Sequence, residues 1–248
     1  MDKEGNVYVW EKEYLLGESG TEIETNKREN WKIQQLENIP IVTKIYATHD
    51  KFSIVTDEGN LYIWSPKENV NPNMEEMEMI DMETPIINVA ASEEAVFILD
   101  EKHILWRIEN GTKKVFQENV KNIMQGGKGF VFQMMDAENE VYVYNISLLQ
   151  KGYETTVFAD KYEVAKIVFE NKISSISVNK AVAVVRTDKQ EFYQWGRKEN
   201  PQYWYMVIPA ESVYAEPVKI DLADVKYYMI IGKNIVYIDE RNEIFVLL

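Results

Sequence analysis

The sequence predicts an all-β protein built from repeated four-stranded antiparallel units. The first observation is a phrase in which an Asp opens a short polar turn and an aromatic or apolar run follows it. The six copies start at Asp2, Asp57, Asp100, Asp136, Asp188 and Asp239. Their starting points lie 55, 43, 36, 52 and 51 residues apart. Repeats of this length are typical of proteins that stack one supersecondary unit many times.

The second observation is that each phrase joins two strand-like segments. In the second copy, residues 51–56 and 61–64 are rich in β-branched and aromatic side chains. The four polar residues 57–60 between them form a tight reversal. Later hairpins follow the same pattern over residues 95–106, 130–144, 182–195 and 235–247.

The third observation is an apolar stretch in front of each hairpin, at residues 41–46, 86–90, 120–124, 173–178 and 225–231. A more polar segment closes the unit, as at residues 31–36, 114–116 and 218–222. The inner strands are nearly continuous apolar runs, which is expected when both of their faces are buried. Four strands per unit predict a β-propeller, whose blades pack face to face around an axis. Residues 147–165 depart most from the repeat, and we expect a short helix or excursion there.

The repeat count leaves five or six blades open, because six third strands are present but only five leading strand pairs. Residue 1 lies just before a third strand, and the chain stops after another at Leu248. We therefore expect strands from both termini to close the ring and remove exposed sheet edges. No linker rich in Ser, Gly or Pro interrupts the chain, so residues 1–248 are predicted to form a single β-propeller domain of six degenerate repeats.

The repeat resembles that of the regulator of chromosome condensation family. The clearest copy is Trp195-Gly196 with the loop that runs on to Trp204, followed by Pro217-Val218 in the outer strand. Residues 10–17 read as the same loop shortened. The resemblance spans nearly the whole chain and implies a propeller of that type. The Trp-Asp and Gly-His signatures of WD-repeat propellers are absent from the sequence.

The chain departs from this family at several positions. Only Trp195 is followed by Gly, and Pro201 and Trp204 replace loop glycines. The His-Ser pair that opens the family's second strand has become more apolar, for example at Phe52-Ser53. The resemblance therefore indicates a divergent member. The family's exchange-factor activity on a small GTPase depends on loops that find no match here, and it is not expected.

The composition limits the class of partner. The chain has 27 basic and 41 acidic residues, a net charge of −14 and a pI near 4.7. This charge disfavours nucleic acid and anionic membranes and favours a basic protein partner. Cysteine is absent, and no apolar run approaches the roughly 20 residues that span a bilayer. The polar start lacks signal-peptide features, so a cytoplasmic location is expected, with a signal peptide removed upstream left open.

The sequence offers no catalytic constellation. His49 and His103 lie in turns of adjacent repeats, where solvated histidines are commoner than metal ligands. The repeated Asp side chains are expected to cap their own turns. Residues 74–82 hold four methionines, which could bind copper(I). We favour instead an outer strand and loop in which Met fills an irregular gap or gives an adaptable contact surface. Nucleotide-binding and nucleophile motifs are absent, so we expect no metal, no cofactor and no enzyme activity.

The most suggestive segment for function is the aromatic loop at residues 201–209. Candidate partner-binding residues are Tyr203, Trp204, Tyr205 and Met206, with Tyr14 from another blade. Tyr and Trp dominate binding hot spots because they bury a large area with few rotamers. The alternative is that Tyr203 replaces a core Leu of the family and its neighbours pack beneath the loop.

These observations predict a non-catalytic protein–protein interaction module with an unidentified, basic protein partner, and we expect a monomer. A more specialised form would inhibit an enzyme by covering its active site, as one propeller of the resembled family does to β-lactamases. The alternative from a different class is a carbohydrate-binding or glycan-processing propeller enzyme.

Overall fold

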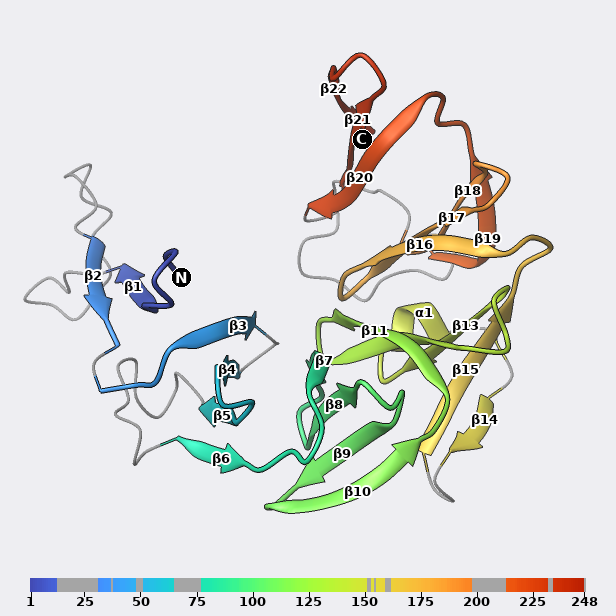
Figure 1. Cartoon of the computed structure of the whole chain (residues 1–248). Helices are drawn as coiled ribbons and strands as arrows, with labels where there is room; N and C mark the ends of the chain where they lie inside the picture. Colours follow the sequence, from blue (N-terminus) through green and yellow to red (C-terminus); the bar gives the residue numbers. More distant parts are fainter. Residues whose placement is uncertain are drawn as a thin grey trace, which may run out of the picture. The chain divides into compact units, whose positions relative to one another are not determined.

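A computed structural model describes residues 1–12, 31–36, 38–47, 51–64, 77–150, 153, 155–158, 162–197, 213–231 and 234–247. The chain forms two compact units, Met1–Glu83 and Thr84–Leu248, and each is described by itself. Every sheet in the described ranges is antiparallel, and their single helix is the short α1 (Ser147–Gln150) (Figure 1). The prediction of an all-β fold of four-stranded units is confirmed.

The first unit contains two sheets. Strands β1 (Tyr8–Lys12) and β2 (Trp31–Gln35) form a pair. The second sheet has the order β3 (Val42–Ala47), β4 (Phe52–Thr56), β5 (Leu61–Trp64) and β6 (Glu78–Ile80). A core shared by the two sheets contains Val7, Leu36, Val42, Ile54, Tyr62, Trp64 and Met77.

The second unit begins with two sheets that follow each other in the chain. The first has β7 (Ile86–Ala91), β8 (Val96–Asp100), β9 (Leu105–Glu109) and β10 (Thr112–Gln117) in consecutive order. The next contains β11 (Val120–Gly126), β12 (Gly129–Met134), β13 (Glu140–Tyr144), β14 (Thr155–Phe158) and β15 (Tyr162–Val168). Its spatial order is β11-β12-β13-β15-β14, so β14 is an added edge strand. The predicted excursion at 147–165 therefore holds α1 and this strand.

Two more sheets complete the second unit. One consists of β16 (Ile173–Val178), β17 (Val182–Thr187), β18 (Phe192–Arg197) and β19 (Val213–Ile220). The other has three strands, β20 (Val225–Ile231), β21 (Asn234–Asp239) and β22 (Ile244–Leu247). All four sheets of this unit are meanders from a leading strand outward, apart from the added β14.

Consecutive sheets of the second unit pack face to face. In β12, Phe130 and Phe132 contribute to the core shared with the β7–β10 sheet, where the ring centroids of Phe97 and Phe130 are 4.6 Å apart. Val131 between them contributes to the opposite core, shared with β16 and β17. Successive side chains of a strand point to opposite faces, so one strand serves two cores. This explains why the inner strand β12 is buried along its whole length.

The leading strands β7, β11, β16 and β20 lie next to one another in sequence order (Figure 1). Side-chain hydrogen bonds cross from one to the next. Gln125 Oε1 accepts from Ala91 N at 2.6 Å, and its Nε2 donates to Ala91 O at 3.0 Å. Ile230 N donates to Ser177 Oγ at 3.2 Å. Stacked sheets with leading strands side by side are consecutive blades of a β-propeller. Ring closure and the number of blades stay predictions.

The repeated phrase has a capping role at three of its six positions. Asp2 Oδ1 accepts the N–H groups of Glu4 and Asn6, and Asp239 Oδ1 likewise accepts those of Arg241 and Glu243. Asp100 makes the corresponding bonds to Lys102 and Ile104. The predicted turn cap is confirmed at these three residues.

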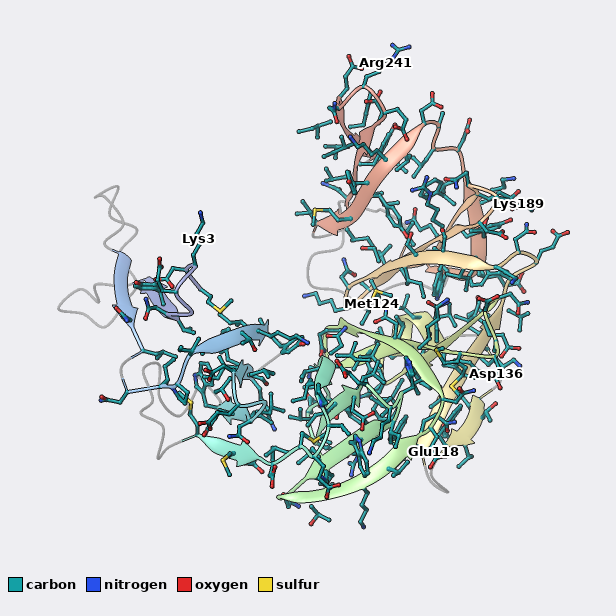
Figure 2. All side chains as sticks on the ribbon, viewed as in Figure 1. Lys3, Glu118, Met124, Asp136, Lys189 and Arg241 are labelled. Atoms are coloured by element: carbon teal, nitrogen blue, oxygen red, sulfur yellow. The ribbon has the colours of Figure 1, made fainter. Side chains whose placement is uncertain are left out.

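At the other copies the Asp is not the capping residue. The backbone bond that closes the turn starts at Thr56 and Thr187 rather than at Asp57 and Asp188. The two threonines are buried and the two aspartates are exposed. Asp136 is also exposed in its turn (Figure 2). The prediction that all six side chains cap their turns is therefore wrong for these three, because turn register follows backbone bonding rather than the position of the Asp.

The same turns join each sheet to the next one. Val42 N donates to Gly5 O at 3.3 Å, so a turn of one sheet holds the start of the next leading strand. Val120 N donates to His103 O at 2.9 Å in the same way, and Ile173 N donates to Glu138 O at 2.8 Å. His103 Nδ1 also lies 3.0 Å from Val120 O. His103 is thus a structural turn residue at a sheet junction.

Candidate protein-binding surface

The residues predicted to bind a partner, namely Tyr14, Tyr203, Trp204, Tyr205 and Met206, lie outside the described residues, and so do His49 and Met74. Of the methionines that follow Met74, Met77 and Met82 are buried and Met79 is 53% exposed. Met77 packs in the core of the first unit, which agrees with the gap-filling interpretation. Within the described ranges, no three His, Asp or Glu side chains gather as a metal site would require.

The described residues reveal an exposed apolar surface that the sequence reasoning missed. It lies on one face of the β20–β22 sheet, and we call it the β20–β22 face. Its five most exposed members are Tyr227 (64%), Met229 (53%), Ile231 (54%), Ile244 (71%) and Val246 (51%). Directly paired residues share a face, and Met229 pairs with Val236, which in turn pairs with Val246. The five side chains therefore form one surface across the sheet.

The opposite face of this sheet is fixed against its neighbour. Ile235 and Val225 are buried in a core with Val184 and Phe192 of the β16–β19 sheet. The rings of Phe192 and Tyr228 meet edge to face with centroids 5.3 Å apart. The β20–β22 face is thus the outward side of an anchored sheet. The expectation that inner strands are buried on both faces is met by β12 but not by β20 or β3.

A groove of about 450 Å³ adjoins this face at the start of β20, and we call it the β16–β20 groove. It is lined by Ser174, Ser175, Arg186, Gln190, Lys226, Tyr227 and Tyr228. Tyr227 belongs to both the groove and the face. The other phenol is held inside, since the hydroxyls of Ser175 and Tyr228 are 3.0 Å apart. Burial raises the pKa of Tyr228 to about 12, although the Ser175 hydrogen bond and Arg186 act against this rise. The phenol is therefore neutral at physiological pH.

Two cations line the groove. Arg186 donates from Nε to Gln190 Oε1 at 2.7 Å and from Nη2 to the same oxygen. Its Cζ lies 5.5 Å from the centroid of the Phe192 ring. Lys226 donates from Nζ to Asn242 Oδ1 at 3.0 Å. Within the described part of the chain, neither cation forms an ion pair with a carboxylate.

Membrane insertion through a helix finds no support in the described residues. None of their helices is long and apolar enough to cross a bilayer. The features that remain for function are surface features: an apolar sheet face and a groove with two cations. Together with the stacked sheets, they define the class as a propeller-type repeat protein with an exposed apolar surface.

Solved structures confirm the propeller architecture. The chain is similar over 99% of its length to Prp20p from Saccharomyces cerevisiae, with a TM-score of 0.66, 15% identity and 68% of that chain covered. It is equally similar to yeast RCC1 (Prp20) bound to Kap60, with a TM-score of 0.66, 14% identity, and 99% and 66% of the two chains covered. For human WBSCR16 the TM-score is 0.61 at 11% identity, with 83% and 61% covered.

These comparisons establish the fold and nothing finer. The resemblance to the regulator of chromosome condensation propellers, expected from Trp195-Gly196 and its surroundings, is confirmed at the level of structure. No family model matches the sequence, and no curated protein matches it either. The chain spans 61–68% of the length of the three structures.

Proposed function

We propose that this propeller is a non-catalytic protein–protein interaction module. The observation that carries the proposal is the β20–β22 face, where five large apolar side chains stand exposed on an anchored sheet. Contiguous apolar surface of this kind marks interaction sites, because burying it against a partner removes it from water. Its members include Tyr227 and Met229, residue types that are enriched in interfaces.

The similar structures support a binding role. The structure of Prp20p concerns its binding to Gsp1p and histones, and the other yeast structure shows it bound to Kap60. For the present chain we likewise propose that a surface of the propeller binds another protein. Its cytoplasmic location, its monomeric state and a role as an enzyme inhibitor belong to the same proposal. Inhibition would require the face to cover an enzyme's active site.

Ring closure by strands from both termini would be a competing use of this surface. A closed ring would bury the β20–β22 face within the protein, as the other blade faces are buried. Substitutions on the face would then lower the stability of the protein. If the face serves a partner, the same substitutions would weaken binding and leave stability nearly unchanged, because exposed positions tolerate polar residues.

The test is affinity capture from the native host with wild type, Val246→Glu and Val168→Glu. Val168 is a matched control, since it is 58% exposed on a strand of another sheet in the same unit. We expect wild type and the control to retain the same partner and Val246→Glu to lose it, with unchanged circular dichroism. The triple variant Tyr203/Trp204/Tyr205→Ala tests the loop predicted from the sequence.

Three results would count against the proposal. The first is a wild-type protein that retains no partner, and the second is equal retention by Val246→Glu and its control. The third is a large loss of stability in Val246→Glu alone, which would favour ring closure over this face. Loss of the partner only in the triple variant would move the site from the face to the loop.

A further inference from the structure

The β16–β20 groove holds two cations apart from the carboxylates that are abundant in this chain. The chain has 41 acidic and 27 basic residues, and several described cations outside the groove pair with glutamates. Such pairs include Lys166 with Glu140 at 2.6 Å and Lys219 with Glu191 at 2.6 Å. Arg186 and Lys226 instead contact neutral amide oxygens. Their positive charges are thus available to a ligand.

The Arg186 guanidinium is positioned before any ligand arrives. Gln190 binds one edge of it, and the Phe192 ring lies beside it. The two hydrogens on Nη1 have no partner among the described residues, so one edge remains open for a hydrogen-bond acceptor. A guanidinium that is already held in place loses little side-chain freedom when it binds, which favours affinity.

We propose that the β16–β20 groove is a carboxylate-binding site, occupied by an acidic side chain of a peptide segment or by a small organic acid. A carboxylate matches a guanidinium edge in shape and charge. Lys226 and Tyr227 also line the groove, and their ammonium and hydroxyl groups can complete the donor set.

The groove's size and the charge of the protein define the ligand further. A volume of about 450 Å³ is typical of sites for organic ligands and exceeds one carboxylate group, so the ligand has a body beyond its acid. A net charge of −14 repels a dianionic phosphate more strongly than a carboxylate monoanion. The Tyr227 ring adjoins the apolar β20–β22 face, and it favours an apolar body next to the carboxylate.

This site goes beyond the proposed protein interaction, because it would bind a free acid even in the absence of a protein partner. It also reverses the expectation of a basic partner at this position. The net charge sets the long-range field, whereas two cations in contact with the ligand set the local preference. An acidic group can therefore be selected by an acidic protein.

Isothermal titration calorimetry of the full chain with two blocked tripeptides tests the proposal. One is N-acetyl-Leu-Glu-Leu-amide and the other is its Gln counterpart, both at low salt of about 50 mM, where screening is weak. We expect the Glu peptide to bind at least about tenfold more tightly, because charge-assisted bonds are the stronger ones. Arg186→Gln should weaken it about tenfold or more, and Lys226→Gln several-fold. Lys189→Gln is the matched control, since Lys189 lies in the neighbouring turn and does not line the groove (Figure 2).

Titration with succinate separates the two sources of the carboxylate. Binding of succinate as tight as that of the peptide assigns the site to small acids, and binding of the peptide alone assigns it to peptide segments. Equal affinity for the Glu and Gln peptides overturns the proposal. So does an equal loss in Lys189→Gln, or no saturable binding of either peptide or succinate.

Two variants keep this test independent of folding and of the proposed function. Lys226 is an exposed side chain whose ammonium donates to Asn242 and lies over the Tyr227 ring, so Lys226→Gln should fold if Arg186→Gln does not. Val246→Glu is expected to abolish capture of a protein partner and to leave succinate binding in place. Failure of one proposal can therefore be distinguished from failure of the other.

Discussion

Replacing Asp100 with Ala should destabilise the second unit by about 3 kcal/mol. The Asp100 side chain accepts four hydrogen bonds, two from the turn amides of Lys102 and Ile104 at 3.0 and 2.9 Å. The others come from Trp106 Nε1 at 2.9 Å and Thr84 Oγ1 at 2.8 Å. Loss of a capping side chain costs about 1 kcal/mol, and loss of bonds to a charged acceptor costs about 1.5–3 kcal/mol each. These losses add only partly, because the four bonds belong to one network on a single side chain.

Asp188→Ala is the matched control for this prediction. Asp188 begins another copy of the same sequence phrase, but it is exposed, and Thr187 occupies the capping position of its turn. We expect its removal to change stability by less than about 0.5 kcal/mol. Urea unfolding followed by circular dichroism measures both variants. Equal destabilisation by the two substitutions, or a change below about 0.5 kcal/mol for Asp100→Ala, would refute the capping argument.

Three further predictions concern the same unit. Burial acts to raise the pKa of Asp100, but its hydrogen bonds hold that pKa below the ordinary value of 3.8. The carboxylate therefore stabilises the fold fully above about pH 5 and loses this effect as pH falls through its folded-state pKa. The urea midpoints of wild type and Asp100→Ala should accordingly converge as the pH is lowered toward about 3. Gln125→Ala should lower the free energy of unfolding by about 2 kcal/mol, because Gln125 Oε1 accepts from the Ala91 amide at 2.6 Å. Hydrogen exchange of that amide should become at least about tenfold faster. Unchanged exchange would contradict the role of this hydrogen bond. Phe97→Ala should lower the free energy of unfolding, measured in urea, by about 3–5 kcal/mol, because Phe97 is fully buried. Val157 is 58% exposed, and Val157→Ala should lower it by less than about 0.5 kcal/mol. Similar losses in the two variants would count against the packing argument.

Much of the fold could be predicted from the sequence because its determinants are local. Residues 61–64 and 173–178 were predicted as strands and coincide with β5 and β16. Alternating burial and turn residues act within a few positions, so they can be read from a short segment. The added strand β14 (Thr155–Phe158) was missed, since it depends on pairing with β15 rather than on the repeat.

The exposed β20–β22 face could not be predicted from the sequence, because its determinants are not local. β20 reads Val-Lys-Tyr-Tyr-Met-Ile-Ile and is as apolar as the leading strand β7, yet four of the six residues of β7 are buried and only Val225 is buried in β20. Whether a second sheet covers an apolar face depends on packing between distant segments, and no local pattern records it. The groove cations have the same origin, because Arg186 and Lys226 lie 40 positions apart in the chain and come from different sheets.

The turn that joins one sheet to the next has a consequence for how this chain can evolve. At Gly5–Val42, His103–Val120 and Glu138–Ile173, the junction consists of a main-chain carbonyl and a main-chain amide. The three accepting carbonyls belong to a glycine, a histidine and a glutamate, so the hydrogen bond itself does not specify one side chain. The side chain can therefore change at Glu138 without removing its junction bond, whereas Gly5 has a φ of +86° and an added Cβ there would lie 2.8 Å from Ile41. Because the bond runs between main-chain atoms, the spacing between two sheets can be kept after the side chain at their junction has changed.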